Sequence, residues 1–207
     1  GVLLAGARRS AREHGIAHEE LSATEVHARF PGIEVPSDFT GLLELRAGVL
    51  DPEGCVAAHL TLPARAGARV MPNEPVLRWT SSRAGVAAET EAARYEAARL
   101  VVSVGAWVPA LVPGLPIPLQ VERQVMLWFQ PSGDATVFGP ERCPVGMIEY
   151  APDRIFYSLP DLGDGLKAAI HHEGEITTPE SVRRQVNERD ITPVRALLQQ
   201  FMPGANG

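Results

Sequence analysis

Hydrophobic and polar residues alternate along the second half of the chain, in short segments that are separated by turn residues. The segments read QVERQVMLWFQ, VGMIEYA, RIFYSLP and GLKAAIHH, and they lie between residues 120 and 172. Alternation with a period of two is typical of strands that bury one face. We therefore predict an antiparallel sheet in this part of the chain.

The first half mixes strand signals of different kinds. GVLLAG, at residues 1–6, is apolar at nearly every position and predicts a buried strand that needs neighbours on both faces. TGLLELRAGVL predicts another strand, and shorter strand-like stretches alternate in RVMPNEPVLRWTSS and AGVAAETEAARYEAARL. The run from Leu100 to Val104 is rich in β-branched residues and predicts a buried parallel strand that enters a turn at Gly105.

Helices are predicted from caps and prolines. Asp51 precedes PEGCVAAHLTLPAR and predicts a helix that ends near Gly67. TPVRALLQQFM predicts a helix with Thr192 as its cap and Pro193 at its first position. SAREHGIAHEELSATEVHARF carries Leu21 and Val26 among charges and predicts two short helices, with Ser22 and Thr24 placed as caps.

The prolines of VPALVPGLPIPLQ mark a crossing between two regions. We predict an α/β region at residues 47–108 and an antiparallel region at residues 109–207, with residues 1–46 as the first piece of the latter. Pro179 opens a helical turn within the second region. The chain starts on an apolar run without Met and stops directly after a helix, so we expect both ends to be cut from a longer protein.

Composition narrows the partners and the compartment. The net charge is −6, which leaves no basic surplus to neutralise a phosphate backbone, so we expect no nucleic acid partner. Cys55 and Cys143 form neither a disulfide framework nor a metal-binding spacing, which favours a reducing cytoplasm. The apolar runs are broken by Gly and Pro and are too short to span a bilayer, so we expect no membrane association.

Lys167 is the only lysine among 19 basic residues, so every other positive side chain of this kind is an arginine. An ammonium is a compact point charge on a flexible stem, whereas a guanidinium is a wide planar fork. A lysine kept against this bias suggests a chemical role. Chance survival on a solvated surface is the alternative.

The neighbours of Lys167 favour a site on one sheet face. On a strand over residues 165–171, Lys167, Ala169 and His171 share one face, and the other face is apolar. The connection DLGDG suits a hairpin and would bring Tyr157 near the same surface. A Lys, a His and a Tyr over a small Ala leave room for a planar ligand; an ordinary solvated sheet face is the alternative.

Other motifs give weaker signals. GDGLKA fits the glycine fingerprint of dinucleotide folds only loosely, because Gly174 would cut a following helix short, and we predict a hairpin instead. His14 and His18 stand one helical turn apart beside Glu19, a spacing that suits zinc, but a solvated helix face is favoured, and the adjacent His residues of HHEGE should point in opposite directions. We therefore expect no metal. VVSVGAW would let backbone approach a ligand at a strand end, with a plain turn as the alternative.

The chain resembles the monomeric sarcosine oxidase family of flavin-dependent amine oxidases, which includes N-methyltryptophan oxidase. The resemblance rests on seven segments in the family's order, namely ARFPGI, GVLDPEGCV, VVSVGAW, VERQV, YSLP, GLKAAIHH and FMPGANG. It implies an α/β fold plus an antiparallel sheet, in which residues 47–108 are part of an FAD-binding (Rossmann-like) domain. Residues 1–46 would then begin a substrate domain, and residues 109–207 would supply its antiparallel sheet and closing helix.

The resemblance covers only the middle of such an enzyme. The family's Gly-x-Gly-x-x-Gly turn for the FAD pyrophosphate, its flavin-bonding cysteine and its clamp for the substrate carboxylate lie in segments that have no counterpart here. Neither Cys55 nor Cys143 occupies the place of that cysteine. We therefore expect FAD in the longer parent, weak or absent FAD binding by this chain alone, and an isolated chain without activity.

The resemblance also implies roles for single residues. Lys167 matches the family lysine that contacts the flavin through water and promotes reaction of the reduced flavin with oxygen. His171 matches the active-site histidine, and Tyr157 matches the tyrosine beside the substrate, although its spacing to Lys167 is one residue shorter and requires a tighter hairpin. Segments near the FAD are matched by Val76, Ser103, Gly105, Ala106 and Trp107.

The family's activity implies oxidation of a secondary amine, such as sarcosine or another N-methyl amino acid, to an imine, with oxygen reduced to hydrogen peroxide. A fixed charge at Lys167 would stabilise the superoxide that forms, and an arginine would crowd the flavin face. We expect a monomer whose partners are a small amine and oxygen. Two alternatives stay open: a non-catalytic domain that binds a small ligand or partner, and the same fold acting on a cyclic imino acid or a sugar-modified amino acid.

Overall fold

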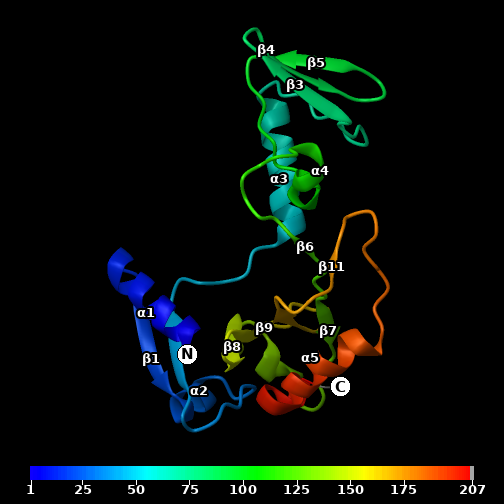
Figure 1. Ribbon diagram of the computed structural model, residues 1–207. Helices are drawn as coiled ribbons and strands as arrows, with labels where there is room; N and C mark the ends of the chain where they lie inside the picture. Colours follow the sequence, from blue (N-terminus) through cyan, green and yellow to red (C-terminus); the bar gives the residue numbers. More distant parts are fainter. Residues whose placement is uncertain (206–207) are drawn as a thin grey trace. The chain divides into compact units, whose positions relative to one another are not determined.

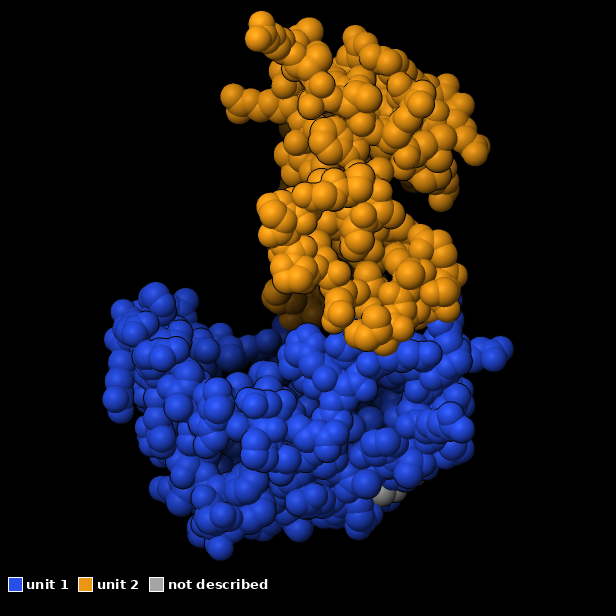
Figure 2. Space-filling view, in the orientation of Figure 1, with its two compact units in different colours: residues 1–49, 122–175, 183–207 blue, residues 50–121, 176–182 orange. Residues whose placement is uncertain are grey.

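The computed structural model describes residues 1–205 of the chain. The chain divides into two compact units, which Figure 2 shows in different colours. Unit 1 comprises residues 1–49, 122–175 and 183–207, and unit 2 comprises residues 50–121 and 176–182. The chain therefore leaves unit 1 near residue 49, returns near residue 122, and passes once more through unit 2 before its final helix.

Unit 1 contains a four-stranded sheet in the order β7-β10-β9-β8 (Figure 1). Each strand pairs antiparallel with its neighbours. The strands are β7 (Leu127–Phe129), β8 (Gly146–Ala151), β9 (Arg154–Leu159) and β10 (Leu166–His171). The antiparallel sheet that the alternating segments predicted is thus confirmed.

One face of this sheet is covered by helix α5 (Glu188–Phe201). The helix buries Val194, Leu197, Leu198 and Phe201, a helical spacing that places all four on one side. These residues join the side chains that the sheet sends to the same face in one core cluster, which includes Phe129, Phe156, Leu166 and Ala168. The core of unit 1 is therefore a helix packed on a sheet.

Helix α5 begins earlier than the sequence predicted. Its N-cap is Asn187, whose side chain accepts from the Arg189 N–H, and Asp190 completes a capping box by accepting from the Asn187 N–H. The prediction that Thr192 caps the helix and that Pro193 occupies its first position is wrong, because Pro193 lies inside the helix. The capping box satisfies the first free N–H groups and so starts the helix five residues upstream.

The opening segment is a helix and not the predicted buried strand. α1 (Val2–His14) buries only Ala11, and Val2 is 70% exposed. The Glu149 carboxylate accepts hydrogen bonds from the Val2 and Leu3 N–H groups at 3.0 Å each. A carboxylate at this position pairs free donors of the first turn and complements the helix dipole, which favours the helix.

The next elements of unit 1 are β1 (His18–Ser22), α2 (Ala23–Arg29) and β2 (Thr40–Glu44). β1 pairs antiparallel with β2, which confirms the strand predicted in TGLLELRAGVL. The predicted cap at Ser22 is confirmed, since its hydroxyl accepts from the Glu25 N–H in a capping box, whereas the predicted cap at Thr24 is wrong because Thr24 lies inside α2. The first of the two predicted short helices is wrong, because that segment contains the end of α1 and then β1.

Unit 2 contains helix α3 (Pro52–Arg65) and an antiparallel three-stranded sheet in the order β3-β4-β5. Its strands are β3 (Arg78–Ser82), β4 (Gly85–Glu89) and β5 (Arg94–Ala97). α3 confirms the predicted helix, and Asp51 is its N-cap residue, although the Asp51 side chain makes no capping hydrogen bond.

The predicted parallel strand from Leu100 to Val104 is wrong. These residues have no strand assignment, and Val101 is 87% exposed. A β-branched run needs partner strands to become part of a sheet, and the described sheets give it none. The predicted turn at Gly105 does form, as the start of the short 3₁₀ helix η1 (Gly105–Trp107), which leads into α4 (Val108–Leu111).

Four short elements complete the chain. They are β6 (Val121–Glu122), η2 (Ala135–Phe138), β11 (Ile176–Thr177) and η3 (Pro203–Ala205). β6 and β11 pair in a two-stranded sheet. Residues 179–181 form a turn, in which the Val182 N–H donates to the Thr178 carbonyl at 3.0 Å, so the helical turn predicted at Pro179 is present.

Candidate functional site

The sheet face opposite to α5 carries the residues that the sequence singled out on β10. Leu166 and Ala168 point into the core and are fully buried, so the period of two sends Lys167, Ala169 and His171 to the other face. Lys167 and His171 are partly exposed there. We call this surface the open face of the β7-β10-β9-β8 sheet.

Tyr157 shares the open face. It lies directly opposite Ala169 in the register of β9 and β10, and therefore diagonally between Lys167 and His171. Its ring meets the His171 ring edge-on, with centroids 6.1 Å apart and planes at 84°. Partial burial raises the pKa of the Tyr157 hydroxyl, which keeps the phenol protonated near neutral pH. The structure thus brings Tyr157, Lys167 and His171 together on one surface.

Lys167 contacts an aromatic ring from the neighbouring edge strand. Trp128 on β7 is its cross-strand partner, and the Lys167 Nζ lies 4.6 Å from the centroid of the indole ring. Trp128 is 51% exposed, so the contact lies at the surface of the sheet. Within residues 1–205, no carboxylate forms an ion pair with Lys167. The ammonium is therefore held in a cation–π contact and keeps its net charge.

The connection between β9 and β10 is a hairpin, as predicted for DLGDG, and the dinucleotide alternative for GDGLKA is excluded by it. The Asp161 carboxylate accepts from the Gly163 N–H at 2.7 Å and from the Gly165 N–H at 2.9 Å. Gly165 has φ 105°, and a Cβ there would lie 2.7 Å from the Phe129 carbonyl oxygen. Only glycine fits where β10 begins beside β7, so this residue fixes the register that places Lys167.

The two adjacent histidines do not point in opposite directions, contrary to the expectation from strand alternation. β10 ends at His171, and His172 has a left-handed φ of 55°, which breaks the alternation. The two rings approach with centroids 3.8 Å apart. His172 Nδ1 also lies 3.7 Å from the Glu122 carboxylate, whose pKa is lowered mainly by a hydrogen bond from the Gly174 N–H.

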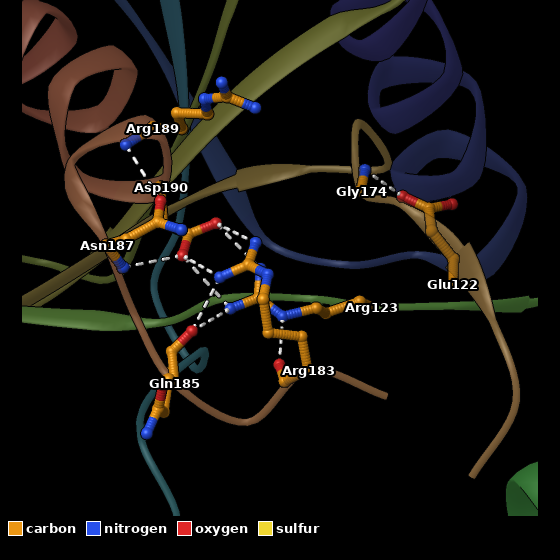
Figure 3. Close-up of polar contacts among 8 residues, drawn as sticks. All are labelled: Glu122, Arg123, Gly174, Arg183, Gln185, Asn187, Arg189 and Asp190. Carbon is orange, nitrogen blue, oxygen red and sulfur yellow. Dashed lines mark hydrogen bonds and ion pairs between the residues drawn. The ribbon is translucent and has the colours of Figure 1, made fainter. Parts of the chain in front are cut away.

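A buried polar network holds the start of α5, and sequence reasoning missed it (Figure 3). Arg123 donates to both carboxylate oxygens of Asp190, at 2.7 and 3.1 Å, and also to the carbonyls of Arg183 and Gln185. Arg183 donates to the same carboxylate. The two guanidinium groups, Arg183 first, hold the pKa of Asp190 well below its usual range. The network ties the returning chain to the sheet and has a structural role.

The residues predicted to bind the cofactor lie in unit 2. Gly105, Ala106 and Trp107 are consecutive in η1, Ser103 precedes them in an irregular exposed stretch, and Val76 is 42% exposed before β3. Ala106 and Trp107 line a hollow of about 280 Å³ together with residues of 109–121 and 176–180. Val76 and Ser103 are not among its lining residues. Two of these five residues therefore line the hollow, and Gly105 directly precedes them in η1.

The structure does not favour a reactive thiol at Cys143 or a zinc site at His14 and His18. Cys55 and Cys143 are free thiols, and burial raises the pKa of Cys143 to about 11, which leaves its thiol protonated and unreactive. His14 ends α1 and His18 begins β1. The prediction that the two histidines share one helix face is therefore wrong. Within the described residues, no group of three His, Cys, Asp or Glu side chains could hold a metal. No helix in the same part of the chain has the length and apolar character needed to cross a membrane.

Comparisons with known proteins agree on a family. A family model described as FAD dependent oxidoreductase matches residues 3–207. Monomeric sarcosine oxidase of Streptomyces avermitilis is 37% identical, over 100% of this chain and 54% of that protein. N-methyl-L-tryptophan oxidase of Salmonella arizonae is 33% identical, over 100% of this chain and 55% of that protein. The chain thus spans about half the length of the curated relatives it matches.

Solved structures show the same fold. NikD, described as an unusual amino acid oxidase essential for nikkomycin biosynthesis, has a TM-score of 0.72 at 20% identity, over 97% of this chain and 52% of that one. L-proline dehydrogenase from P. horikoshii has a TM-score of 0.75 at 13% identity, over 93% of this chain and 50% of that one. At these identities the likeness concerns the fold alone.

Proposed function

Because this chain belongs to the FAD dependent oxidoreductase family, we propose that it forms part of a flavin-dependent oxidase that acts on a secondary amine. The proposed substrate is sarcosine or another N-methyl amino acid, the class that the names of its relatives indicate. The amine and dioxygen are converted to an imine and hydrogen peroxide, and water then hydrolyses the imine. The observation that carries the proposal is the ammonium of Lys167, which lies on the open face and pairs with no carboxylate of residues 1–205.

The open face fits a flavin by the chemistry of its side chains. It offers an ammonium, an imidazole and a phenol around Ala169. Ala169 itself is fully buried, so a flat group would lie over the partly exposed side chains of Lys167, His171 and Tyr157. Lys167, His171 and Tyr157 are the residues we propose to face the ring, and Val76, Ser103, Gly105, Ala106 and Trp107 are those we propose to lie near the rest of FAD. When bound, FAD supplies the two-electron chemistry that removes a hydride equivalent from the amine carbon and returns the electrons to oxygen.

In this proposal, Lys167 acts on the oxygen half of the reaction. Negative charge develops on dioxygen as it accepts an electron, and a fixed ammonium nearby stabilises that charge. Electrostatic stabilisation of this kind is worth about 3 kcal/mol, or roughly a hundredfold in rate. An ion pair with a carboxylate would weaken the effect, and Lys167 forms none within the described residues. Arginine could not offer so compact a charge beside a ring.

His171 and Tyr157 act on the amine half. The edge-on contact between their rings restrains both side chains, so that they present a hydrogen-bonding imidazole and a protonated phenol to the same space. We propose that His171 orients the substrate and that Tyr157 lies beside it. Neither residue needs to act as an obligatory base, because the unprotonated amine can be selected by its own titration.

The division of the chain into two units is consistent with separate regions for substrate binding and FAD binding. We propose that unit 1 supplies the substrate domain and that unit 2 is part of the FAD-binding domain. The proposed protein is a cytoplasmic monomer, in keeping with two free cysteines. The alternative substrate class for the same face is a cyclic imino acid or a sugar-modified amino acid.

A second candidate function is a non-catalytic domain that binds a small ligand or partner. The exposure of the proposed cofactor residues favours it for the chain alone, since Val76 is 42% exposed and Trp107 is 51% exposed. We accordingly propose that the isolated chain holds FAD weakly and is inactive. A folded, colourless preparation supports this candidate for the chain alone, and a yellow one contradicts it.

The test uses the 207-residue chain beside a protein that contains it at the full length of the relatives. We expect flavin absorbance in the longer protein and peroxide formation with sarcosine or another N-methyl amino acid. Absence of both from a folded longer protein would contradict the proposal. A dye-coupled peroxide assay with a panel of secondary and primary amines then ranks the substrates.

A further inference from the structure

Trp128 is the neighbour that determines where the Lys167 ammonium can lie. The residues come from β7 and β10, which are not consecutive in sequence but are adjacent in the sheet. They stand directly opposite each other in the register, and the Lys167 Nζ lies 4.6 Å from the centre of the indole ring. On its other side Lys167 faces Leu159 of β9, which offers no polar group. The ring is therefore the contact that restrains the ammonium.

Several arginines of the chain pair with carboxylates, although Arg29, Arg154 and Arg195 also lie 5.8 to 6.0 Å from a ring centroid. Arg8 pairs with Glu20 at 2.6 Å and Arg154 with Glu173 at 2.6 Å, so each cation is partly neutralised. An indole ring attracts a cation through its quadrupole and has no net charge. Trp128 therefore restrains Lys167 without cancelling the positive charge.

We propose that Trp128 is a positioning residue for the oxygen half of the reaction, because it holds the Lys167 ammonium on the open face with its charge intact. This inference rests on the proposed function. Without the ring, the four-carbon stem of lysine lets the ammonium move through solvent, and it spends less time where charge develops on oxygen. A surface cation–π contact restrains the group by a factor of roughly two to five.

The single lysine makes the contact directly measurable in the 207-residue chain without any cofactor. Lysine labelled with ¹³C at Cε gives one NMR signal, and the ring current of an indole shifts protons above its face upfield. We expect an upfield Hε signal in the wild-type chain, a smaller shift in Trp128→Phe, and the position of free lysine in Trp128→Leu. Trp79→Leu is the matched control, since Trp79 lies in unit 2 and donates to the Leu111 carbonyl. This control should leave the signal unchanged.

A reciprocal measurement does not depend on the stability of the leucine variant. The chain has three tryptophans and thus three indole N–H signals. Trp128→Phe should delete one of them, and Lys167→Met should move that same signal. Two results would overturn the inference. One is a wild-type Hε chemical shift equal to that of free lysine, and the other is a Trp128 indole N–H signal that does not move in Lys167→Met.

The functional part is tested in the flavin-loaded protein of full length. Trp128→Leu should slow the reaction with oxygen roughly two- to fivefold while leaving flavin reduction by the amine unchanged, and Trp128→Phe should restore most of the rate. If Lys167→Met slows the oxygen reaction and Trp128→Leu does not, the inference fails and the proposed function stands. If neither variant slows it, the role proposed for Lys167 fails as well.

Discussion

The two faces of the β7-β10-β9-β8 sheet are built from the same strands and serve different ends. The covered face packs Phe156, Leu166 and Ala168 against α5, and each of these side chains is fully buried. The open face carries Lys167, Tyr157 and His171, and Trp128 and Met147 on it are each 51% exposed, although Ala169 between them is fully buried. Along β10, residues that pack in the core thus alternate with residues to which we assign a chemical role.

The difference teaches that the exposed neighbour of Lys167 on the open face, Trp128, should contribute less to stability than the buried residues of the covered face. The covered face fixes the backbone, and the backbone then fixes which open-face residues are neighbours. Open-face side chains can consequently change without unfolding the sheet. Mutations that separate stability from activity can test this division.

The largest effect on stability is expected from the covered face. Phe201 is fully buried, and its ring lies 6.3 Å from that of Phe39 and 6.4 Å from that of Phe156. Phe201→Ala should lower the free energy of unfolding by about 3–5 kcal/mol, because it leaves a cavity. Urea denaturation followed by circular dichroism measures it. Met147→Ala is the control from the open face, since Met147 stands opposite Tyr157 and is 51% exposed. Equal losses in both variants would contradict the division.

A smaller loss is expected where the covered face is tied to the returning chain. Arg123 and Asp190 have side chains that are 8% and 9% exposed. Arg123→Met should cost about 2–3 kcal/mol, because it removes hydrogen bonds to a carboxylate and leaves carbonyl groups unpaired. Arg142→Met serves as the control, since Arg142 is 44% exposed and 3.7 Å from Asp134. If Arg142→Met lowers the free energy of unfolding as much as Arg123→Met, the buried network does not stabilise the fold more than an exposed ion pair does.

The same network predicts a dependence of stability on pH. The folded pKa of Asp190 lies below its ordinary value of 3.8 because Arg183 and Arg123 donate to the carboxylate. Its contribution is therefore complete above the unfolded pKa and is lost as the pH falls through the folded one. Between about pH 5 and pH 2, the wild-type chain should lose more stability than Asp190→Asn. Parallel curves for the two proteins would show that Asp190 does not titrate in this way.

The sequence was sufficient to predict the parts of the fold that depend on local pattern. The strands around Tyr157 and Lys167 alternate clearly, and the glycines of DLGDG signal a hairpin, so their shared face could be derived. The prediction failed at GVLLAG and at Leu100 to Val104, where an apolar run has no partner strand among the described residues. A composition that suits a buried strand does not form one without neighbours.

The sequence predicted the part of the site that lies on β9 and β10, two strands joined by a hairpin. It did not predict contacts with strands that are distant in sequence. Trp128 lies on β7, which pairs with β10 across many residues of intervening chain, so no local pattern connects it with Lys167. The network of Arg123 and Asp190 likewise joins segments far apart in sequence. The alternation of side chains ends at His172 because its backbone has a left-handed φ. A histidine at this position does not by itself predict that conformation. Each of these depends on tertiary contacts.

The smallest effect on stability is expected at Lys167 itself. Its ammonium lies in an exposed cation–π contact, which is worth about 0.5–1 kcal/mol. Lys167→Met keeps the length of the side chain and should lower the free energy of unfolding by no more than about 1 kcal/mol. Urea denaturation beside Phe201→Ala measures this difference. A loss as large as that of Phe201→Ala would place Lys167 in the core and remove the distinction between the faces.

The central proposal is that the Lys167 ammonium assists the reaction of the reduced flavin with oxygen in the full-length protein. Stopped-flow absorbance of the full-length, flavin-loaded Lys167→Met variant follows flavin reduction by the amine and reoxidation by oxygen separately. We predict that reoxidation slows roughly a hundredfold or more, while reduction changes far less. Equal slowing of both half-reactions, or an unchanged rate of reoxidation, would contradict the account.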